Sequence, residues 1–276
     1  MIYDAHAHLG TPQERQIRRG TPIISMICAQ NPPEAQELEI LCRQEAKNPS
    51  WLIPAYGLHP WQTGDYTVRD MEPFLSRASI IGEIGMDNVW CEVPLDRQQE
   101  AFEAQLALAH TAHKPVVLHT KGQETEIARI IRRYPNRYLV HWYSDLHGLE
   151  AYLDQDCYFT LGPDLKQNPA VHQVLALAPK ERILVETDGW SAVEWTIGAP
   201  APISGLPGIL TENMKEIARF HKLSLSEAGQ LLEENFWRFT EPPKAFSSIF
   251  PFENGVVIAV ITPENFIKNL IKQNNK

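Results

Sequence analysis

The sequence contains few cysteines, and no two of them have the spacing of a metal-binding or redox pair. The four cysteines (Cys28, Cys42, Cys91 and Cys157) are scattered along 276 residues, and none forms a C-x-x-C pair. Disulfide frameworks and structural zinc knuckles both need cysteines at close, regular spacing, so both are excluded. We therefore expect free thiols and a cytoplasmic location, where thiols stay reduced.

Long apolar runs and a basic leader are absent as well. The sequence has no uninterrupted apolar run of about eighteen residues or more, the length that a membrane-spanning helix needs. The first ten residues, MIYDAHAHLG, lack the basic region and apolar stretch of a secretory signal. We expect no membrane span and no secretion.

Positive charge is scarce. The chain has 25 lysines and arginines against 34 aspartates and glutamates, which gives a net charge of −9. A broad footprint on double-stranded nucleic acid normally needs a basic face, so this class of binding is disfavoured. A phosphodiester, a small molecule or a single strand held locally by metal ions stays compatible with this charge.

The chain alternates short apolar runs with longer amphipathic stretches, which is typical of repeated strand–helix units. Some runs, such as PVVLH at 115–119, are almost wholly apolar, as in parallel strands that are covered on both faces. The predicted strands are Ile2–His8, Pro22–Cys28, Leu52–His59, Ser79–Met86, Pro115–His119, Arg137–Trp142, Cys157–Leu161 and Arg182–Glu186. The predicted helices are Pro33–Lys47, Pro94–His113, Glu124–Tyr134, Leu146–Asp154, Asn168–Leu177, Leu210–His221 and Leu225–Phe239.

Eight strands with helices between them predict an α/β fold, a (β/α)8 TIM barrel, over residues 1–241. A doubly wound open sheet is the alternative, but no G-x-G-x-x-G follows the first strand, so a dinucleotide site has no support. After Pro242-Pro243 the pattern changes. For residues 242–276 we predict a small extension, with a strand at Gly255–Thr262 and a short helix at Pro263–Lys272, that packs on the barrel or contacts a partner. The oligomeric state stays open.

Ionisable residues stand at the ends of five predicted strands. His6 and His8 are two apart on one strand and so project to the same face. The others each follow an apolar run: Glu83, His119, His141 and Asp188. Barrel enzymes place catalytic groups at this end of the strands, and buried imidazoles and carboxylates need partners or a metal ion. Mixed imidazole and carboxylate ligands suit several divalent cations, so the pattern predicts a metal site.

Six ordered motifs carry a resemblance to a known family. They are D-A-H-A-H at 4–8, G-L-H-P at 57–60, G-E-I-G-M-D at 82–87, H-T-K at 119–121, H-W at 141–142 and E-T-D at 186–188. Over roughly residues 1–240 the sequence resembles the TatD-like family of metal-dependent hydrolases, which is related to the amidohydrolases. The order and spacing of the motifs make this match specific, although each motif alone is weak.

The resemblance implies a centre of two divalent ions, such as zinc, manganese or magnesium. One ion would be bound by His6, His8, Glu83 and Asp188, and the other by Glu83, His119 and His141. Glu83 would bridge the two ions, and Asp188 would also accept a proton from water and deliver it to the leaving group. The implied activity is phosphodiester hydrolysis of the DNase type. Asp4 is expected either to orient a ligand histidine or to lie directly in the interior.

Substrate contacts are expected at positions near these motifs. His59 is expected just outside the metal ligands, where it orients substrate or simply stabilises its loop. Lys121 stands where nuclease-like relatives commonly have arginine, and it can meet a phosphate only as a point charge. Trp142 begins a W-Y-S-D stretch, and Trp190 follows the unusual Gly189 after E-T-D. These departures make hydrolysis a safer prediction than DNase activity.

Five of the seven tryptophans fall shortly after predicted strands: Trp61, Trp90, Trp142, Trp190 and Trp195. Their rings could form an aromatic cradle, that is, a set of ring faces that stacks on a planar group of the substrate. Alternatively, the rings only pack the loops against one another.

Two other functions stay open at this point. The same centre could hydrolyse a carbonyl substrate such as a lactone, cyclic amide or ester, an option that Lys121 and the acidic surface favour. The barrel could instead be a non-catalytic metal-binding interaction module that uses residues 242–276 as its contact surface. The intact set of expected ligands argues against this last option.

Overall fold

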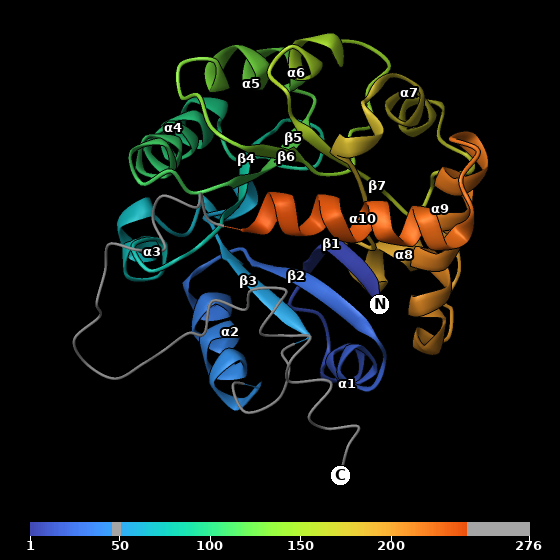
Figure 1. Ribbon diagram of the computed structural model, residues 1–276. Coiled ribbons are helices and arrows are strands. Elements are labelled where there is room, and N and C mark those ends of the chain that lie inside the picture. Colours follow the sequence, from blue (N-terminus) through green and yellow to red (C-terminus); the bar gives the residue numbers. More distant parts are fainter. Residues whose placement is uncertain (46–50, 242–276) are drawn as a thin grey trace.

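Eight parallel strands form the centre of the molecule. The computed structural model describes residues 1–45 and 51–241. Within these ranges the strands are hydrogen-bonded in chain order, each to the next. They are β1 (Ile2–His8), β2 (Ile23–Ala29), β3 (Leu52–Tyr56), β4 (Ile81–Asp87), β5 (Val116–Lys121), β6 (Tyr138–Val140), β7 (Tyr158–Leu161) and β8 (Ile183–Val185). Because β1 also contacts β8, the sheet is a nearly closed barrel (Figure 1). This confirms the predicted TIM barrel and excludes the doubly wound alternative.

Helices surround the strands, and most of them lie where the amphipathic pattern predicted them. The helices are α1 (Pro12–Gly20), α2 (Pro32–Glu45), α3 (Val68–Leu75), α4 (Leu95–Thr111), α5 (Glu124–Ile131), α6 (Glu150–Leu153), α7 (Pro169–Leu177), α8 (Trp190–Ile197), α9 (Leu206–Phe220) and α10 (Leu225–Thr240). Three short 3₁₀ turns are η1 (Pro60–Gln62), η2 (Lys180–Arg182) and η3 (Ile203–Gly205). None of the helices described is long and apolar enough to cross a membrane.

Three helices were not predicted, for physical reasons that differ. The buried face of α1 carries Glu14 and Arg18, so its sequence lacks the apolar stripe by which a helix is recognised. Helix α3 contains Pro73 in its interior, which is a helix-breaking signal. Helix α8 lies inside the long connection after β8, where the regular strand–helix spacing is interrupted.

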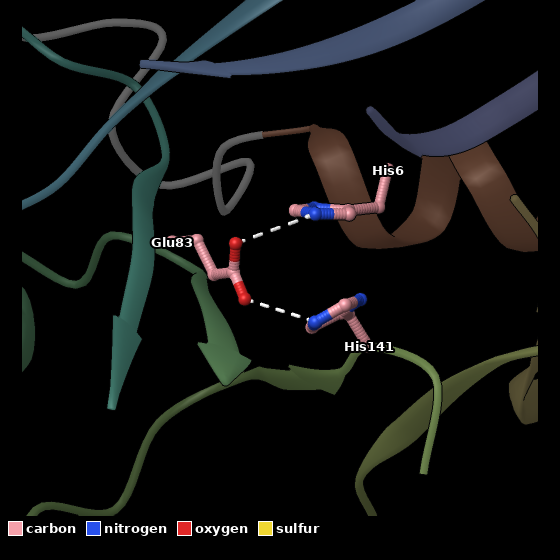
Figure 2. A group of neighbouring side chains, drawn as sticks. All are labelled: His6, Glu83 and His141. Atoms are coloured by element: carbon pink, nitrogen blue, oxygen red, sulfur yellow. Dashed lines mark ion pairs between the residues drawn. The ribbon is translucent and has the colours of Figure 1, made fainter. Parts of the chain in front are cut away.

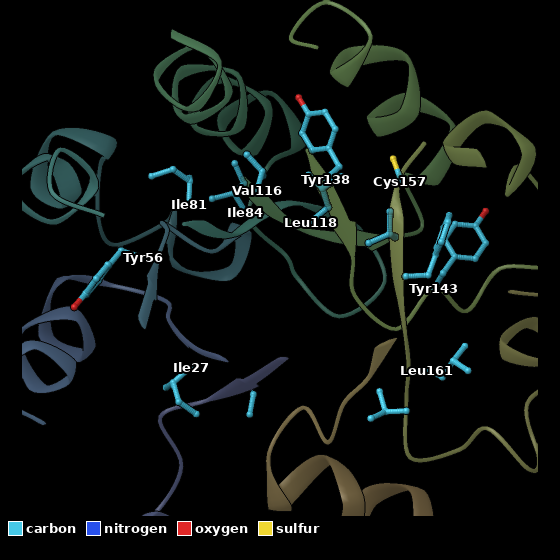
Figure 3. Packing of buried hydrophobic residues seen from close by; sticks show 14 of the residues in the cluster. Ile27, Tyr56, Ile81, Ile84, Val116, Leu118, Tyr138, Tyr143, Cys157 and Leu161 are labelled. Carbon is cyan, nitrogen blue, oxygen red and sulfur yellow. The ribbon is translucent and has the colours of Figure 1, made fainter. Parts of the chain in front are cut away.

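The core has two layers. The larger cluster fills the space between the strands and the outer helices, and Figure 3 shows part of it, with Ile81, Val116 and Tyr138 among its members. The smaller cluster fills the barrel interior with side chains such as Met26 and Leu184. Because alternate residues of a strand face opposite sides, a strand such as β6 supplies both layers, with Tyr138 in the larger cluster and Leu139 in the smaller.

Helix α10 closes the amino-terminal end of the barrel. Its start is fixed by a capping box in which Ser224 and Glu227 accept each other's backbone N–H groups. Phe236 packs on Tyr3, which lies near the start of β1, with ring centroids 4.9 Å apart. Figure 1 shows α10 lying across this end of the barrel. The carboxyl ends of the strands are therefore the end at which a site can open. The predicted extension at 242–276 lies outside the described residues.

Candidate metal centre

The structure brings together all six residues that were expected to bind metal. The strands β1, β4 and β5 carry His6, His8, Glu83 and His119, while His141 and Asp188 follow β6 and β8 closely. Parallel barrel strands end at one rim, so residues far apart in sequence converge there. Four of the six are buried, and His8 and Asp188 are partly exposed at the edge of the group.

Glu83 stands at the centre of this group, and its two carboxylate oxygens face different histidines. Oε2 lies 3.4 Å from Nε2 of His6 and 3.4 Å from Nε2 of His8. Oε1 lies 2.7 Å from Nδ1 of His119 and 2.9 Å from Nε2 of His141. Figure 2 shows His6 and His141 on the two separate oxygens. A buried carboxylate whose two oxygens face different pairs of histidines can bind one cation through each oxygen.

Asp188 completes the first of these two groups. Its Oδ1 lies 3.2 Å from Nε2 of His6 and 3.3 Å from Nε2 of His8. Three buried atoms here, Nε2 of His6, Oε2 of Glu83 and Oδ1 of Asp188, have no hydrogen-bond partner among the described residues. Bonds of about 2.0–2.2 Å to one cation place neighbouring ligand atoms roughly 3.0–3.5 Å apart. The observed contacts of 3.2–3.4 Å fit this spacing, so the donor set suits a divalent ion.

Two further carboxylates, which we did not predict as site residues, lie beside the histidines of the second group. Oδ2 of Asp87 lies 3.0 Å from Nε2 of His119, and Oε1 of Glu186 lies 3.4 Å from Nδ1 of His141. A carboxylate on the far nitrogen fixes the ring and makes the near nitrogen a better ligand. The sequence could have indicated both carboxylates, because Asp87 belongs to the motif G-E-I-G-M-D and Glu186 to the motif E-T-D.

The electrostatics of the group favour positive charge between the carboxylates. Burial raises the pKa of Glu83, but the charges of His141 and His6 outweigh it and hold that pKa well below its usual range. Burial lowers the pKa of His141, and the Glu83 charge overcomes this and raises it to about 10. Protonated histidines thus balance the buried carboxylates, and a divalent cation would supply the same balance and release those protons.

His59 lies beside the group and stays neutral. Burial lowers its pKa to about 4, even though Glu83 lies nearby. Its Nδ1 accepts the backbone N–H of Trp61 at 3.3 Å, which leaves the proton on Nε2, 3.6 Å from Oε2 of Glu83. The structure therefore places His59 next to the six residues, with an N–H directed at their central carboxylate.

The three other expected substrate contacts lie in different surroundings. Lys121, at the end of β5, donates to Oγ of Ser144 at 2.9 Å. Trp142 directly follows His141, and its indole N–H donates to Asp164 at 2.7 Å. Trp190 is only 7% exposed, and its indole N–H donates to the backbone oxygen of Ala201. It therefore packs beneath the loop that follows β8 rather than at the surface of that loop.

Asp4 holds the strand-end loop that carries Asp188, in place of the expected contact with a ligand histidine. Its Oδ1 accepts the backbone N–H of Thr187 at 2.9 Å, and its Oδ2 accepts the Thr187 hydroxyl at 2.7 Å. The buried Arg18 donates to both Asp4 and Thr187, at 2.6 and 3.0 Å. Asp188, the next residue, has a φ of 57°, in the left-handed region. The network fixes the backbone on which this conformation depends.

We expect Thr187→Val to lower the free energy of unfolding by about 1–3 kcal/mol, because it leaves buried polar partners on Asp4 and Arg18 unsatisfied. Urea denaturation measures the change. Thr211→Val is the matched control, since its hydroxyl donates only to Pro207 of its own helix and its loss should cost less than about 0.5 kcal/mol. An equal loss in both variants would contradict the role of the network.

Comparison with known proteins gives one consistent result. A family model described as TatD related DNase matches residues 3–241. An uncharacterized metal-dependent hydrolase, YabD of Bacillus subtilis, is 22% identical over 262 residues, which cover 85% of this chain and 97% of YabD. The 3'-5' ssDNA/RNA exonuclease TatD of a Rahnella species is 27% identical over 187 residues, 60% of this chain and 65% of that protein.

The fold also matches solved structures. The crystal structure of YjjV, a TatD homologue from Escherichia coli, superposes with a TM-score of 0.69 at 22% identity. The match covers 86% of this chain and 97% of that one. It supports the barrel architecture independently of the sequence motifs.

Proposed function

Because the chain belongs to the family of TatD-related DNases and is a metal-dependent hydrolase that acts on ester bonds, we propose that it hydrolyses phosphodiester bonds of nucleic acid with two divalent cations. The observation that carries the proposal is the buried Glu83 carboxylate, whose two oxygens face two separate histidine groups. Family membership favours an enzyme over a non-catalytic binding module.

The ligands divide into two groups by the contacts of Glu83. One cation would be held by His6, His8, Asp188 and Oε2 of Glu83, the atoms that converge at 3.2–3.4 Å. The other would be held by Oε1 of Glu83 with His119, which is hydrogen-bonded to Asp87, and His141, which lies beside Glu186. Mixed nitrogen and oxygen donors accept zinc, manganese and magnesium ions.

The residues of the chain then have separate tasks in hydrolysis. Bound divalent cations lower the pKa of a water molecule and neutralise charge that develops on a phosphoryl oxygen. Asp188 accepts the proton of the attacking water and returns it to the leaving oxygen, and its side chain is 18% exposed, so substrate can reach it. His59 directs its Nε2–H into the site, and Lys121 meets a phosphate oxygen as a point charge.

A direct test compares substrates on protein stripped of metal and reloaded with zinc, manganese or magnesium. We expect metal-dependent shortening of single-stranded DNA and cleavage of a generic phosphodiester, with no turnover of lactones, cyclic amides or carboxylic esters. Turnover of only those carbonyl substrates would contradict the proposal and favour the alternative that Lys121 and the acidic charge keep open.

Metal binding should also stabilise the protein. A cation that binds only the folded state at a hundred times its dissociation constant adds about 2.7 kcal/mol per site. We therefore expect Tm to rise when the stripped protein is reloaded, as measured by differential scanning calorimetry. The same experiment with sodium chloride at matched ionic strength controls for the screening of surface charges by the added salt. An unchanged Tm at saturating zinc and manganese would contradict a preformed site.

A further inference from the structure

Three tryptophans from three different loops meet beside the candidate metal centre. Trp90 follows β4, Trp142 follows β6, and Trp195 lies on α8 after β8. The Trp195 ring centroid is 6.0 Å from that of Trp90 and 6.1 Å from that of Trp142, at interplanar angles of 72° and 76°. In edge-to-face packing the edge of one ring meets the face of another, so the rings do not cover each other completely. Trp90 and Trp195 are accordingly 54% and 65% exposed.

The cluster is anchored to the residues of the metal centre. The backbone N–H of Trp90 donates to Oδ1 of Asp87 at 2.9 Å, and Oδ2 of the same carboxylate contacts His119. Trp142 packs so closely on Gly162 that a Cβ there would lie 2.5 Å from its indole nitrogen. Trp142 is thus a fixed support, while Trp90 and Trp195 present the exposed rings.

The Lys121 ammonium group lies beside one of the exposed rings. Nζ of Lys121 is 4.6 Å from the Trp90 ring centroid and donates to Ser144. Lys121 is also two residues beyond His119 on β5. A cation for the backbone beside aromatic rings for the bases is the combination that binds single-stranded nucleic acid.

We propose that Trp90 and Trp195, with Lys121, form a stacking platform for a base of a single-stranded nucleic acid whose scissile phosphodiester lies at the metal centre. This inference rests on the proposed function and adds the residues that would hold a base beside that site. With a net charge of −9, the chain has no broad electrostatic attraction for nucleic acid, so local stacking has to supply affinity. Stacking tolerates any base, and we therefore expect little sequence preference.

The test measures equilibrium binding of a fluorescein-labelled single-stranded DNA by anisotropy, using the full chain in EDTA so that nothing is cleaved. We expect Trp195→Ala and Trp90→Ala each to weaken binding about tenfold, as for the loss of one stacked base. An oligonucleotide in which abasic sites replace the bases should bind the unchanged protein about as weakly, and the Trp195→Ala variant should no longer distinguish the two strands. Phe220→Ala is the control, because this exposed aromatic ends α9, next to the helix that closes the opposite end of the barrel.

Equal affinity of the Trp195→Ala, Trp90→Ala and Phe220→Ala variants would overturn the platform, even if the chain cleaves DNA as proposed. A changed oligomeric state of Trp195→Ala without a change in DNA affinity would also overturn it, since the rings would then contact a second copy. If the tryptophan variants lose base-dependent binding but no phosphodiester is cleaved by the unchanged protein, the result supports the stacking platform. It contradicts the proposed hydrolysis.

Discussion

Replacing Glu83 by glutamine is expected to lower kcat for a phosphodiester by about a thousandfold or more, and to reduce bound metal from two ions to one or none. The amide keeps the size of the side chain but has only one acceptor oxygen, and its NH₂ group would face a pair of histidines. A cation that loses its shared carboxylate loses several kcal/mol of transition-state stabilisation, and each 1.36 kcal/mol is a factor of ten in rate. Turnover assays and metal analysis by mass spectrometry measure the two effects together.

Glu45→Gln is the matched control for this variant. Glu45 is also buried, but it pairs with Arg19 and ends α2 directly before the residues that lead to β3, at the amino-terminal side of the barrel. Its replacement removes a buried carboxylate and leaves the carboxyl ends of the strands, which carry the candidate metal ligands, unchanged. Full activity and two bound ions in Glu83→Gln would contradict the bridging role. A comparable loss in Glu45→Gln would assign the effect to stability.

Asp188→Asn should lower kcat by about 10²- to 10⁴-fold, the usual contribution of a positioned general acid or base. Asparagine retains an oxygen towards His6 and His8, so we expect KM and the metal content to change much less than kcat. The backbone should tolerate the change, because asparagine adopts the left-handed region about as readily as aspartate does. Steady-state kinetics on a phosphodiester separate the two parameters.

Asp156→Asn controls for this substitution. Asp156 also has a left-handed backbone, with a φ of 55° against 57° for Asp188, but it lies directly before β7 and pairs with Arg182. It is therefore at the opposite end of the barrel, and its variant should retain full turnover. If Asp188→Asn also kept its kcat, proton transfer would have to be assigned to another group.

The strand ends were the most predictable part of the molecule. β1 has the predicted bounds, and β4 and β5 differ from prediction by one or two residues. Of these three strands, β5 begins with the nearly continuous apolar run that is typical of strands covered on both faces. The convergence of His6, Glu83 and His141 followed from this alone, since a parallel barrel brings all its carboxyl ends to one rim. The resemblance to a family then divided the same residues into two groups.

Features that depend on buried charge could not be predicted in the same way. Arg18 reads from the sequence as a surface residue of a polar segment, yet it is buried against Asp4, Glu14 and Thr187. Only the folded structure pairs residues that are 169 positions apart, as Arg18 and Thr187 are. For the same reason the role of Asp4 changed from orienting a histidine to fixing the backbone before Asp188.

The aromatic residues divide in a manner that spacing alone did not indicate. All five tryptophans follow strands, but Trp190 is buried while Trp90 and Trp195 are exposed. Trp190 packs against Gly205, where even a methyl group would lie 3.2 Å from its ring. Of the five tryptophans that could form the expected cradle, Trp90 and Trp195 have the most exposed rings, and variants of these two residues therefore test it.

Anomalous diffraction from crystals of the manganese-loaded protein would show whether Glu83 joins two cations. We expect two anomalous peaks about 3.5–4 Å apart, one on each side of the Glu83 carboxylate. The first should lie within bonding distance of His6, His8 and Asp188, and the second within that of His119 and His141. A single peak, or two peaks that do not share Glu83, would contradict a bridging role for this carboxylate.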